Sequence, residues 1–256
     1  MRKIGKDGLR RAKKIAKIAA ILSIACLVLL PGPTNADAKY STLLQFTSNY
    51  VYRGYSKSNN VTAFQGNIDY EHLSGFFIGS WVSQVDFGDR YYKDRANIEA
   101  NPYVGISLGL SENWRFDAAL AGYLYDGTVY GQEADYSEID ALLHFRDLFT
   151  ARFGASYDAY DCGRSTLDYE INMRYPMTAT VEVSGGLGYE DANPVLKHSD
   201  VYWNLGVGWF LYKHAALALR YYDAHSFDEP KGRTASTRFE PLSISNHVVF
   251  SIAIGF

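Results

Sequence analysis

The chain ends with the ten residues His247–Phe256, which read HVVFSIAIGF. Every second residue from Val248 to Phe256 is apolar, whereas the residues between them, apart from Val249, are small or polar. A period of two predicts a β-strand with one apolar face, because successive side chains of a strand point to opposite faces. This strand needs neighbours to pair with, and the preceding sequence offers them.

Eleven earlier segments show the same alternation. Each has the length, roughly ten residues, that a tilted strand needs to cross the hydrocarbon layer of a membrane. The predicted strands cover residues 41–53, 62–71, 75–86, 96–108, 114–125, 136–145, 149–158, 166–175, 179–189, 200–211, 215–223 and 247–256. The sequence therefore predicts an all-β fold of about 12 antiparallel strands.

The connections between these strands alternate strictly between short and long. The short ones are residues 73–74, 109–113, 146–148, 176–177 and 212–214. The long ones are residues 54–61, 87–95, 126–135, 159–165, 190–199 and 224–246. Short turns at one rim and long loops at the other are typical of a transmembrane up-and-down β-barrel, with the short turns on the periplasmic side. A soluble sandwich gives no reason for this alternation.

The N-terminus predicts export. Residues 1–17 carry eight Lys and Arg against one acidic residue, and residues 18–30 form a short apolar run without charge. This order, followed by the small residues Ala36 and Ala38, is typical of a secretory signal peptide with its cleavage site. The run is too short to span a bilayer as a helix. We therefore expect residues 1–38 to be a cleaved signal peptide and residues 39–256 to form the barrel.

The remaining composition excludes several functions. Without residues 1–38 the chain keeps 17 Lys and Arg and 26 Asp and Glu, a net charge near −9. Such an acidic chain lacks the basic surface that nucleic-acid binding needs. Cys162 is then the remaining cysteine, so an internal disulfide is excluded, and its thiol is either inert or a crosslink between two chains. The sequence has no metal-ligand spacing and no Gly-rich phosphate loop, so we expect no cofactor.

The charged residues of the predicted strands lie on the polar face of the alternation. A charge at the bilayer midplane costs about 2–4 kcal/mol for Arg or Lys, so this face must point into the lumen. The candidate residues of the lumen and its mouth are Arg53, Gln65, Asp86, Glu99, Arg115, Asp117, Asp140, Arg152, Asp168, Glu170, Arg174 and Arg220. Acidic residues outnumber basic ones on this face, which predicts a mildly acidic lumen. Tyr and Trp near strand ends, Trp81 and Trp114 among them, fit aromatic girdles.

Several of these residues leave two interpretations open. Arg53, Gln65 and Asp86 fall at the outer ends of the first three predicted strands, where Arg53 and Asp86 could pair. Such a pair either selects permeating ions or fixes the rim. The other charges either line a channel or form a network inside a narrow barrel. Inward aromatic residues either stack on sugars or fill space: Tyr103, Tyr123, Tyr125, Tyr202, Phe210 and Tyr222. The longest loop, 224–246, either folds inward as a constriction or stays on the surface.

Three motifs near the N-terminus of the predicted barrel carry a family resemblance. They are SNYVYRGYS at residues 48–56, GFFIGSW at residues 75–81 and VDF at residues 85–87. The chain resembles a proteobacterial family of outer-membrane porin-like proteins of about 240 residues, whose function is largely unknown. The alternating last strand with its final Phe256 also resembles the closing strand of outer-membrane barrels. The resemblance implies the outer membrane of a Gram-negative bacterium as the location. It also implies lipid and lipopolysaccharide as surroundings, and Phe256 as the signal for the barrel-assembly machinery.

The predicted function is passive diffusion of small hydrophilic solutes or ions through a narrow, mildly acidic lumen that prefers cations. The alternative is a closed barrel with a structural or surface-interaction role. Segregated charge on the lumen walls favours the pore, whereas compensated pairs of Arg and acid favour the closed barrel. An outer-membrane hydrolase is a third class, and it needs Ser and His together with a polar partner. His72 and Ser74 fall at a predicted periplasmic turn, and no spacing singles out a catalytic set, so we expect no enzyme.

Overall fold

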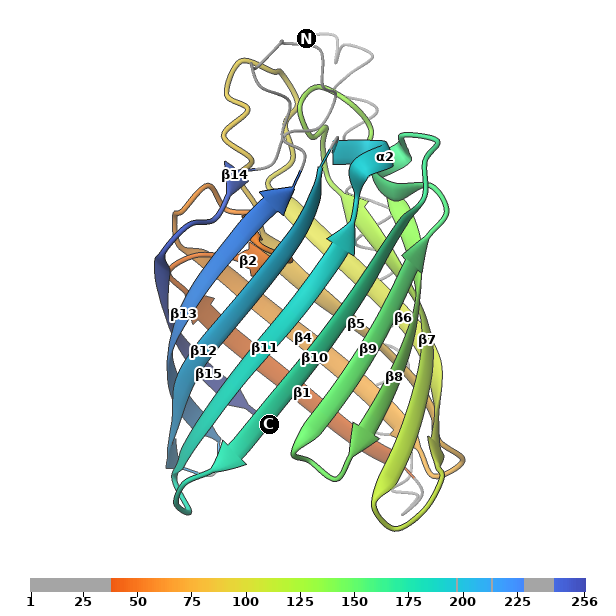
Figure 1. Cartoon of the computed structure of the whole chain (residues 1–256), viewed down its shortest axis with the longest axis vertical. Helices are drawn as coiled ribbons and strands as arrows, with labels where there is room; N and C mark the ends of the chain where they lie inside the picture. Colours follow the sequence, from red (N-terminus) through yellow and green to blue (C-terminus); the bar gives the residue numbers. More distant parts are fainter. Residues whose placement is uncertain (1–37, 197, 213, 228–241) are drawn as a thin grey trace, which may run out of the picture.

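The computed structural model describes residues 38–196, 198–212, 214–227 and 242–256. Twelve antiparallel strands of these residues form a closed barrel (Figure 1). The strands are β1 (Ala38–Thr47), β4 (Ala63–His72), β5 (Phe76–Gln84), β6 (Ile98–Gly109), β7 (Trp114–Tyr125), β8 (Tyr136–Phe145), β9 (Phe149–Ser156), β10 (Thr166–Pro176), β11 (Val181–Asp191), β12 (Ser199–Tyr212), β13 (Ala215–Phe227) and β15 (His247–Gly255). The predicted fold class is confirmed, and the predicted bounds of β7 and β8 match the observed ones.

The C-terminal strand closes the barrel. β15 pairs with β13 on one side and with β1 on the other, and Phe46 lies opposite Ile252 in the β1–β15 register. Thr42 and Phe256 exchange two backbone hydrogen bonds of 2.9 Å at the end of this seam. Closure removes the open edges that would otherwise expose unpaired backbone groups to lipid.

The two rims differ as predicted. Short turns join the strands at the lower rim in Figure 1, and the longer connections gather at the upper rim with the short helix α2 (Asn193–Leu196). The 3₁₀ turn η1 (Ala159–Asp161) belongs to another long connection. The predicted signal peptide, except for Ala38, and residues 228–241 of the longest loop lie outside the described residues. Within the described ranges, no helix is long and apolar enough to cross a membrane.

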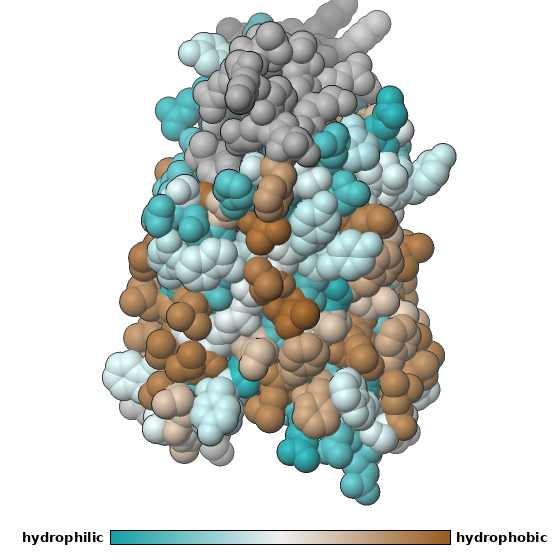
Figure 2. Space-filling model, in the orientation of Figure 1, coloured by the Kyte–Doolittle hydropathy of each residue, from teal (hydrophilic) through white to brown (hydrophobic). Residues whose placement is uncertain are grey.

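The outer wall carries the apolar face of each strand. Figure 2 shows apolar side chains gathered around the barrel wall, with polar ones toward both ends. Leu44, Phe64 and Ile139 are each 62 % exposed, which suits side chains that meet lipid tails. Trp114 and Tyr175 lie exposed near the short-turn rim, where an aromatic girdle is expected.

The first predicted strand is wrong beyond Thr47. There the chain leaves the wall, and two short strands, β2 (Val51–Tyr52) and β3 (Tyr55–Ser56), form a hairpin that pairs with β14 (Leu242–Ser243) in a separate three-stranded sheet. Arg53 and Gly54 connect β2 to β3 with φ of 46° and 84°. Two consecutive positive φ values define a type I′ turn, the tight turn that suits a two-residue hairpin. Alternation continues from β1 to Tyr52, so the period alone gives no sign that the chain has left the wall.

The predicted face of the third strand is also wrong. In the ladder Trp81 lies opposite the inward residues Asn67 and Asn101, so the lumen side of β5 carries Phe77, Gly79, Trp81 and Ser83. Ser80 therefore lies on the outer side, and Asp86 lies beyond the end of the strand. The lumen face of the other strands is indicated by their charged residues, but β5 has none. Trp81 faces a lumen that is lined by other aromatic side chains.

Candidate functional site: the lumen and its inward hairpin

The turn of the hairpin places Arg53 among acidic residues of the barrel wall. Its Nη2 lies 2.5 Å from Oε1 of Glu138 on β8 and 2.7 Å from Oδ1 of Asp168 on β10. Its Nη1 lies 3.5 Å from Oε1 of Glu190 on β11. These side chains are at most 4 % exposed. The hairpin therefore crosses the lumen to reach strands far from β1.

A second arginine holds the same acids from the wall. Arg152 on β9 lies 2.6 Å from Glu138, 2.7 Å from Asp140 and 2.6 Å from Asp168. We call Arg53, Arg152, Glu138, Asp140, Asp168 and Glu190 the ion network. Two guanidinium groups face four carboxyl groups, so each arginine is needed to offset repulsion between buried acids.

Lys57 forms a second buried contact, at the outgoing end of the hairpin. Its Nζ lies 2.9 Å from both carboxylate oxygens of Glu99 on β6 and 3.9 Å from the ring centre of Tyr52. Burial lowers the pKa of Lys57, and the neighbouring Glu99 carboxylate opposes this shift. The paired cation ties the hairpin to β6, whereas Arg53 ties it to β8, β10 and β11.

Polar and aromatic contacts also hold the hairpin in the lumen. The side-chain amide of Asn49 accepts hydrogen bonds from Ser56 at 2.6 Å and Ser58 at 3.0 Å, which fixes the base of the hairpin. The hydroxyl of Tyr52 donates to that of Tyr123 on β7 at 3.1 Å. Tyr123 in turn stacks on a neighbouring tyrosine of β8, so these rings fill the lumen beside the hairpin.

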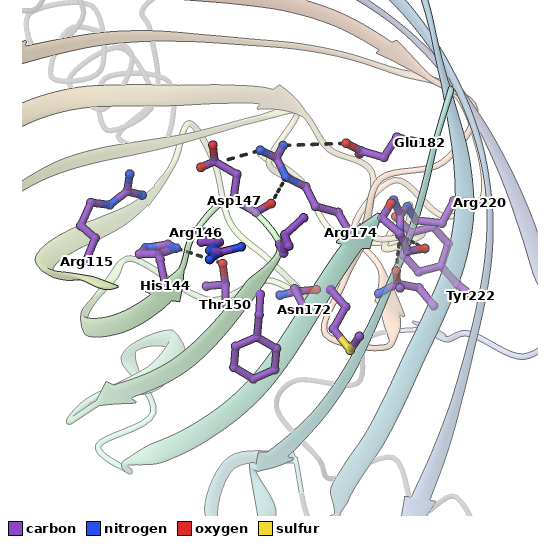
Figure 3. A pocket seen from close by; sticks show the side chains of 16 residues that line it. Arg115, His144, Arg146, Asp147, Thr150, Asn172, Arg174, Glu182, Arg220 and Tyr222 are labelled. Atoms are coloured by element: carbon purple, nitrogen blue, oxygen red, sulfur yellow. Dashed lines mark hydrogen bonds and ion pairs between the residues drawn. The ribbon is translucent and has the colours of Figure 1, made fainter. Parts of the chain in front are cut away.

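Two adjoining cavities occupy the lumen. The first, of about 610 Å³, lies against the hairpin and is lined by Tyr52, Trp81, Tyr103 and wall residues of both charges. The second, of about 510 Å³, reaches the short β8–β9 turn and is shown in Figure 3. Asn204 and Tyr222 line both cavities, so the two adjoin. The described part of the lumen is thus hollow from the hairpin to the short-turn rim.

The second cavity is rich in basic side chains, and we call it the basic vestibule. Its charged and imidazole groups are Arg115, His144, Arg146, Asp147, Arg174, Glu182 and Arg220. They come from β7, β8, the β8–β9 turn, β10, β11 and β13, and they surround the space drawn in Figure 3. The predicted excess of acid does not extend to this cavity, where four arginines face two acids.

The predicted site residues divide into three groups. The structure brings Arg53, Asp140, Arg152 and Asp168 together in the ion network. Glu99 holds Lys57. Arg115, Arg174 and Arg220 line the basic vestibule. Both arrangements of charge that the sequence left open therefore occur. Compensated pairs lie at the hairpin, and segregated charge lies at the short-turn rim.

The remaining predicted residues have local partners. Gln65 accepts a hydrogen bond from Gln45 at 2.9 Å and donates one to Ser83 at 3.1 Å. Glu170 accepts from the Tyr202 hydroxyl at 2.9 Å. Asp117 lies 3.0 Å from Nε2 of His144.

The predicted pair of Arg53 with Asp86 is wrong. Asp86 lies after the end of β5, where its Oδ1 accepts from the backbone N–H of Gly88 at 2.8 Å and lies 3.8 Å from Arg95. Arg53 is directed away from β5 because the chain turns inward after Thr47.

Sequence reasoning missed Lys57, Glu138 and Glu190 as site residues. Lys57 lies between two serines in what reads as a loop, and Glu190 falls beyond the predicted end of its strand. The signal that could have found Lys57 is the sequence YRGY at residues 52–55, since glycine in a two-residue turn predicts a hairpin.

The one His–Ser pair that the sequence offered lies on a turn of the short-turn rim. Nδ1 of His72 lies 2.9 Å from Oγ of Ser74 on the exposed turn, but the backbone N–H of Ser74 also donates to this nitrogen, so the contact belongs to the turn itself. Among the described residues, no group of three His, Cys, Asp or Glu is placed to hold a metal ion. The thiol of Cys162 donates to the carbonyl of Tyr160 at 3.4 Å.

Phe256 is 69 % exposed at the short-turn rim, and its predicted role as an assembly signal stays a prediction.

The sequence matches a family model over residues 34–256, and that family is described as bacterial protein of unknown function (Gcw_chp). The chain belongs to the Gcw_chp family. The predicted membership in an outer-membrane family of unknown function is thereby confirmed for this Gcw_chp protein. A comparison with curated proteins finds no match.

Solved structures similar to the Gcw_chp chain are outer-membrane channels. The NanC porin has a TM-score of 0.51 at 8 % identity, with 85 % of this chain and 99 % of that chain covered. The KdgM porin has 0.50 at 7 % identity, covering 84 % and 98 %. The COG4313 outer membrane channel from Pseudomonas putida F1 has 0.50 at 10 % identity, covering 89 % and 99 %. At such identity the likeness concerns the fold alone, which is the barrel of small outer-membrane channels.

Proposed function

We propose that this Gcw_chp protein is an outer-membrane channel for small hydrophilic solutes, and that the hairpin of β2 and β3 is its constriction. The observation that carries the proposal is the hollow, polar lumen between the hairpin and the short-turn rim, made by two adjoining cavities of about 610 and 510 Å³. A twelve-stranded barrel has more interior than its side chains must fill, unlike the smallest barrels. Whether a solute passes then depends on the outer half of the lumen, where the hairpin lies.

The contacts of the hairpin favour a constriction that can move. Arg53 and Lys57 are held by ion pairs and hydrogen bonds, whose partners can be replaced by water when the hairpin leaves. The hairpin is joined to β1 and β4 by residues 48–50 and 57–62, which are irregular and therefore able to change φ and ψ. Displacement of the hairpin would connect the inner cavities to the outer rim.

A closed barrel with a structural or surface role is the second candidate. It is favoured by the apolar core at the outer end of the lumen, where Tyr125, Val129, Tyr160 and Ile244 are at most 3 % exposed. A core of this kind holds the outer loops together and opposes displacement of the hairpin. The two candidates therefore differ in one property, whether the hairpin moves.

Conductance in a planar bilayer tests the proposal. Protein purified from outer membranes is reconstituted, and single-channel steps are recorded for the wild type and for a double-cysteine variant, Tyr52→Cys with Tyr123→Cys. In this variant a bis-methanethiosulfonate reagent bridges the two thiols and so joins the hairpin to the wall. We expect steps from the wild type, fewer steps from the crosslinked variant, and their return after reduction of the crosslink. Silence from the wild type and also from variants that loosen the hairpin would leave the closed barrel as the function. The predicted periplasmic export, lipid surroundings and assembly by the barrel machinery belong to the same proposal.

A further inference from the structure

The arginines of the basic vestibule are not neutralised in the way that Arg53 and Arg152 are. Arg220 donates from Nη2 to Oγ of Ser184 at 2.5 Å and from Nη1 to the side-chain carbonyl of Asn204. Neither acceptor carries a charge, and no acidic residue of the described chain lies within ion-pair distance of Arg220. A guanidinium fixed in this way keeps its full positive charge in the lumen.

The other arginines are each held through Nε. Nε of Arg115 lies 3.2 Å from Oδ1 of Asp117, Nε of Arg174 donates to the backbone carbonyl of Asp147, and Nε of Arg146 donates to the side-chain carbonyl of Asn113 at 2.9 Å. The Nη atoms of Arg174 lie 3.8 Å from Asp147 and 3.9 Å from Glu182, and half of its side chain is exposed. Contacts of 3.8–3.9 Å leave these terminal donors available to a solute, since strong bidentate pairs are about 1 Å shorter.

The arginines are also arranged around a space rather than along a surface. Figure 3 shows Arg115 at one side of the vestibule and Arg220 at the other, with Arg146 and Arg174 between them. The volume of about 510 Å³ lies within the range of sites that bind small molecules. Low-dielectric barrel walls focus the field of such a group of charges and raise the local concentration of anions.

Neutral hydrogen-bonding groups lie between the arginines. Thr150, Asn172, Asn204 and Tyr222 line the same space, and each offers a donor or an acceptor to a hydroxyl group. A solute that matches both kinds of lining carries a carboxylate for the arginines and hydroxyls for the amides and phenol. A neutral polyol satisfies only the second requirement.

We propose that the basic vestibule is a binding site for small hydroxylated carboxylates and that it makes the channel anion-selective. Binding at the vestibule stands on the geometry alone, whereas selectivity rests on the proposed function. Planar guanidinium groups suit carboxylates because two parallel N–H donors meet two oxygens. This assignment replaces the cation preference that the overall acidic charge predicted, because four arginines face two acids around the vestibule.

Calorimetric titration of detergent-solubilised protein with gluconate, and with glucose as the neutral matched probe, tests the binding. We expect saturable binding of gluconate and none of glucose, with affinity reduced at least about fivefold in Arg220→Gln and in Arg174→Gln, since each removes one charged donor. Arg90→Gln, which makes the same change on an exposed outer loop, should leave the affinity unchanged. Equal binding of the two probes, or binding that neither vestibule variant weakens, would overturn the proposal.

The reversal potential in a potassium gluconate gradient separates this proposal from the proposed function. Anion selectivity that falls at least about threefold in Arg220→Gln supports both, because removing a fixed charge from a pore lowers the local anion concentration. Binding of gluconate without conductance supports the site and contradicts the channel. Conductance that is cation-selective and unaffected by either vestibule variant supports the channel and contradicts the site.

Discussion

Nη2 of Arg53 lies 2.7 Å from Oδ1 of Asp168, although Arg53 follows β1 and Asp168 belongs to β10. Counted around the closed barrel, β10 is the fifth strand from β1 in one direction and the seventh in the other. The contact therefore joins nearly opposite sides of the lumen. The position of the hairpin therefore depends on these buried charges as well as on the apolar core, which includes Tyr55 and against which Tyr50 and Tyr52 pack.

Replacement of Arg53 by Met should loosen the hairpin. The change leaves Glu138, Asp140, Asp168 and Glu190 with Arg152 as the guanidinium that faces them, and losing one partner of a buried pair costs about 3–5 kcal/mol. We expect a higher open probability in bilayers and a lower midpoint of urea unfolding. Arg90→Met, which removes an arginine from an exposed outer loop, is the matched control for open probability.

The outcome that contradicts a gating role for Arg53 is specific. If Arg53→Met lowers the unfolding midpoint while the open probability stays at the wild-type level, the ion network stabilises the barrel without controlling passage.

Gly54 allows the hairpin to lie close against β12 and β13. A Cβ at this position would lie 2.8 Å from Cβ of Ala224 and 3.0 Å from Cβ of Tyr202, and the φ of +84° disfavours any side chain. We expect Gly54→Val to displace the hairpin and to raise the open probability, with the barrel itself intact by circular dichroism. Gly208→Ala, where a Cβ meets nothing within 4 Å, is the control. An unchanged conductance in Gly54→Val would show that the contact with β12 and β13 does not limit passage.

Lys57 and Glu99 should be coupled in stability. Both side chains are fully buried, so Lys57→Met leaves Glu99 without its partner and should cost about 3–5 kcal/mol of unfolding free energy. The double variant Lys57→Met with Glu99→Gln removes both charges and should recover more than half of that loss. Urea unfolding of the wild type, both single variants and the double variant measures the coupling. Additive losses would mean that the two residues stabilise the protein independently.

Most of the barrel wall was predictable because lipid and lumen impose opposite chemistry on alternate residues. In β8, Ile139 faces lipid and the neighbouring Glu138 and Asp140 face the lumen, so the period and the charges indicate the same register. The lengths of the connections predicted the up-and-down topology, since short and long connections alternate along the chain.

The hairpin was not predictable from the same signals. Tyr50 and Tyr52 alternate with smaller and charged residues, as they would on a wall strand, and the positive φ of Arg53 is visible only once the chain is folded. Trp81 was assigned to the lipid side for a similar reason, because the rule that aromatic residues face lipid ignores a lumen filled by other aromatic rings. The ion network depends on strands separated by more than 80 residues, and no local pattern encodes such a contact.

The outer loop between β5 and β6 should be more stable at low pH. Asp89 is 4 % exposed, its Oδ2 accepts from the backbone N–H of Tyr130 at 2.8 Å, and its Oδ1 accepts no hydrogen bond from the described residues. Burial raises the pKa of Asp89 above its ordinary value of 3.8, a shift opposed by the Tyr130 amide and Arg95 and reinforced by Asp86. The folded loop then binds the proton more tightly than the unfolded loop does. Its stability is present below the ordinary pKa and is lost as the pH rises through the raised one.

Hydrogen exchange of the Tyr130 amide, corrected for the intrinsic rate, measures this effect. Protection should fall in the wild type as the pH rises above the ordinary carboxyl pKa of 3.8, because the pKa of Asp89 is shifted upward. In Asp89→Asn the side-chain carbonyl still accepts from Tyr130 but does not titrate, so its protection should stay level over the same range. The same decline in both proteins would mean that a group other than Asp89 controls the loop.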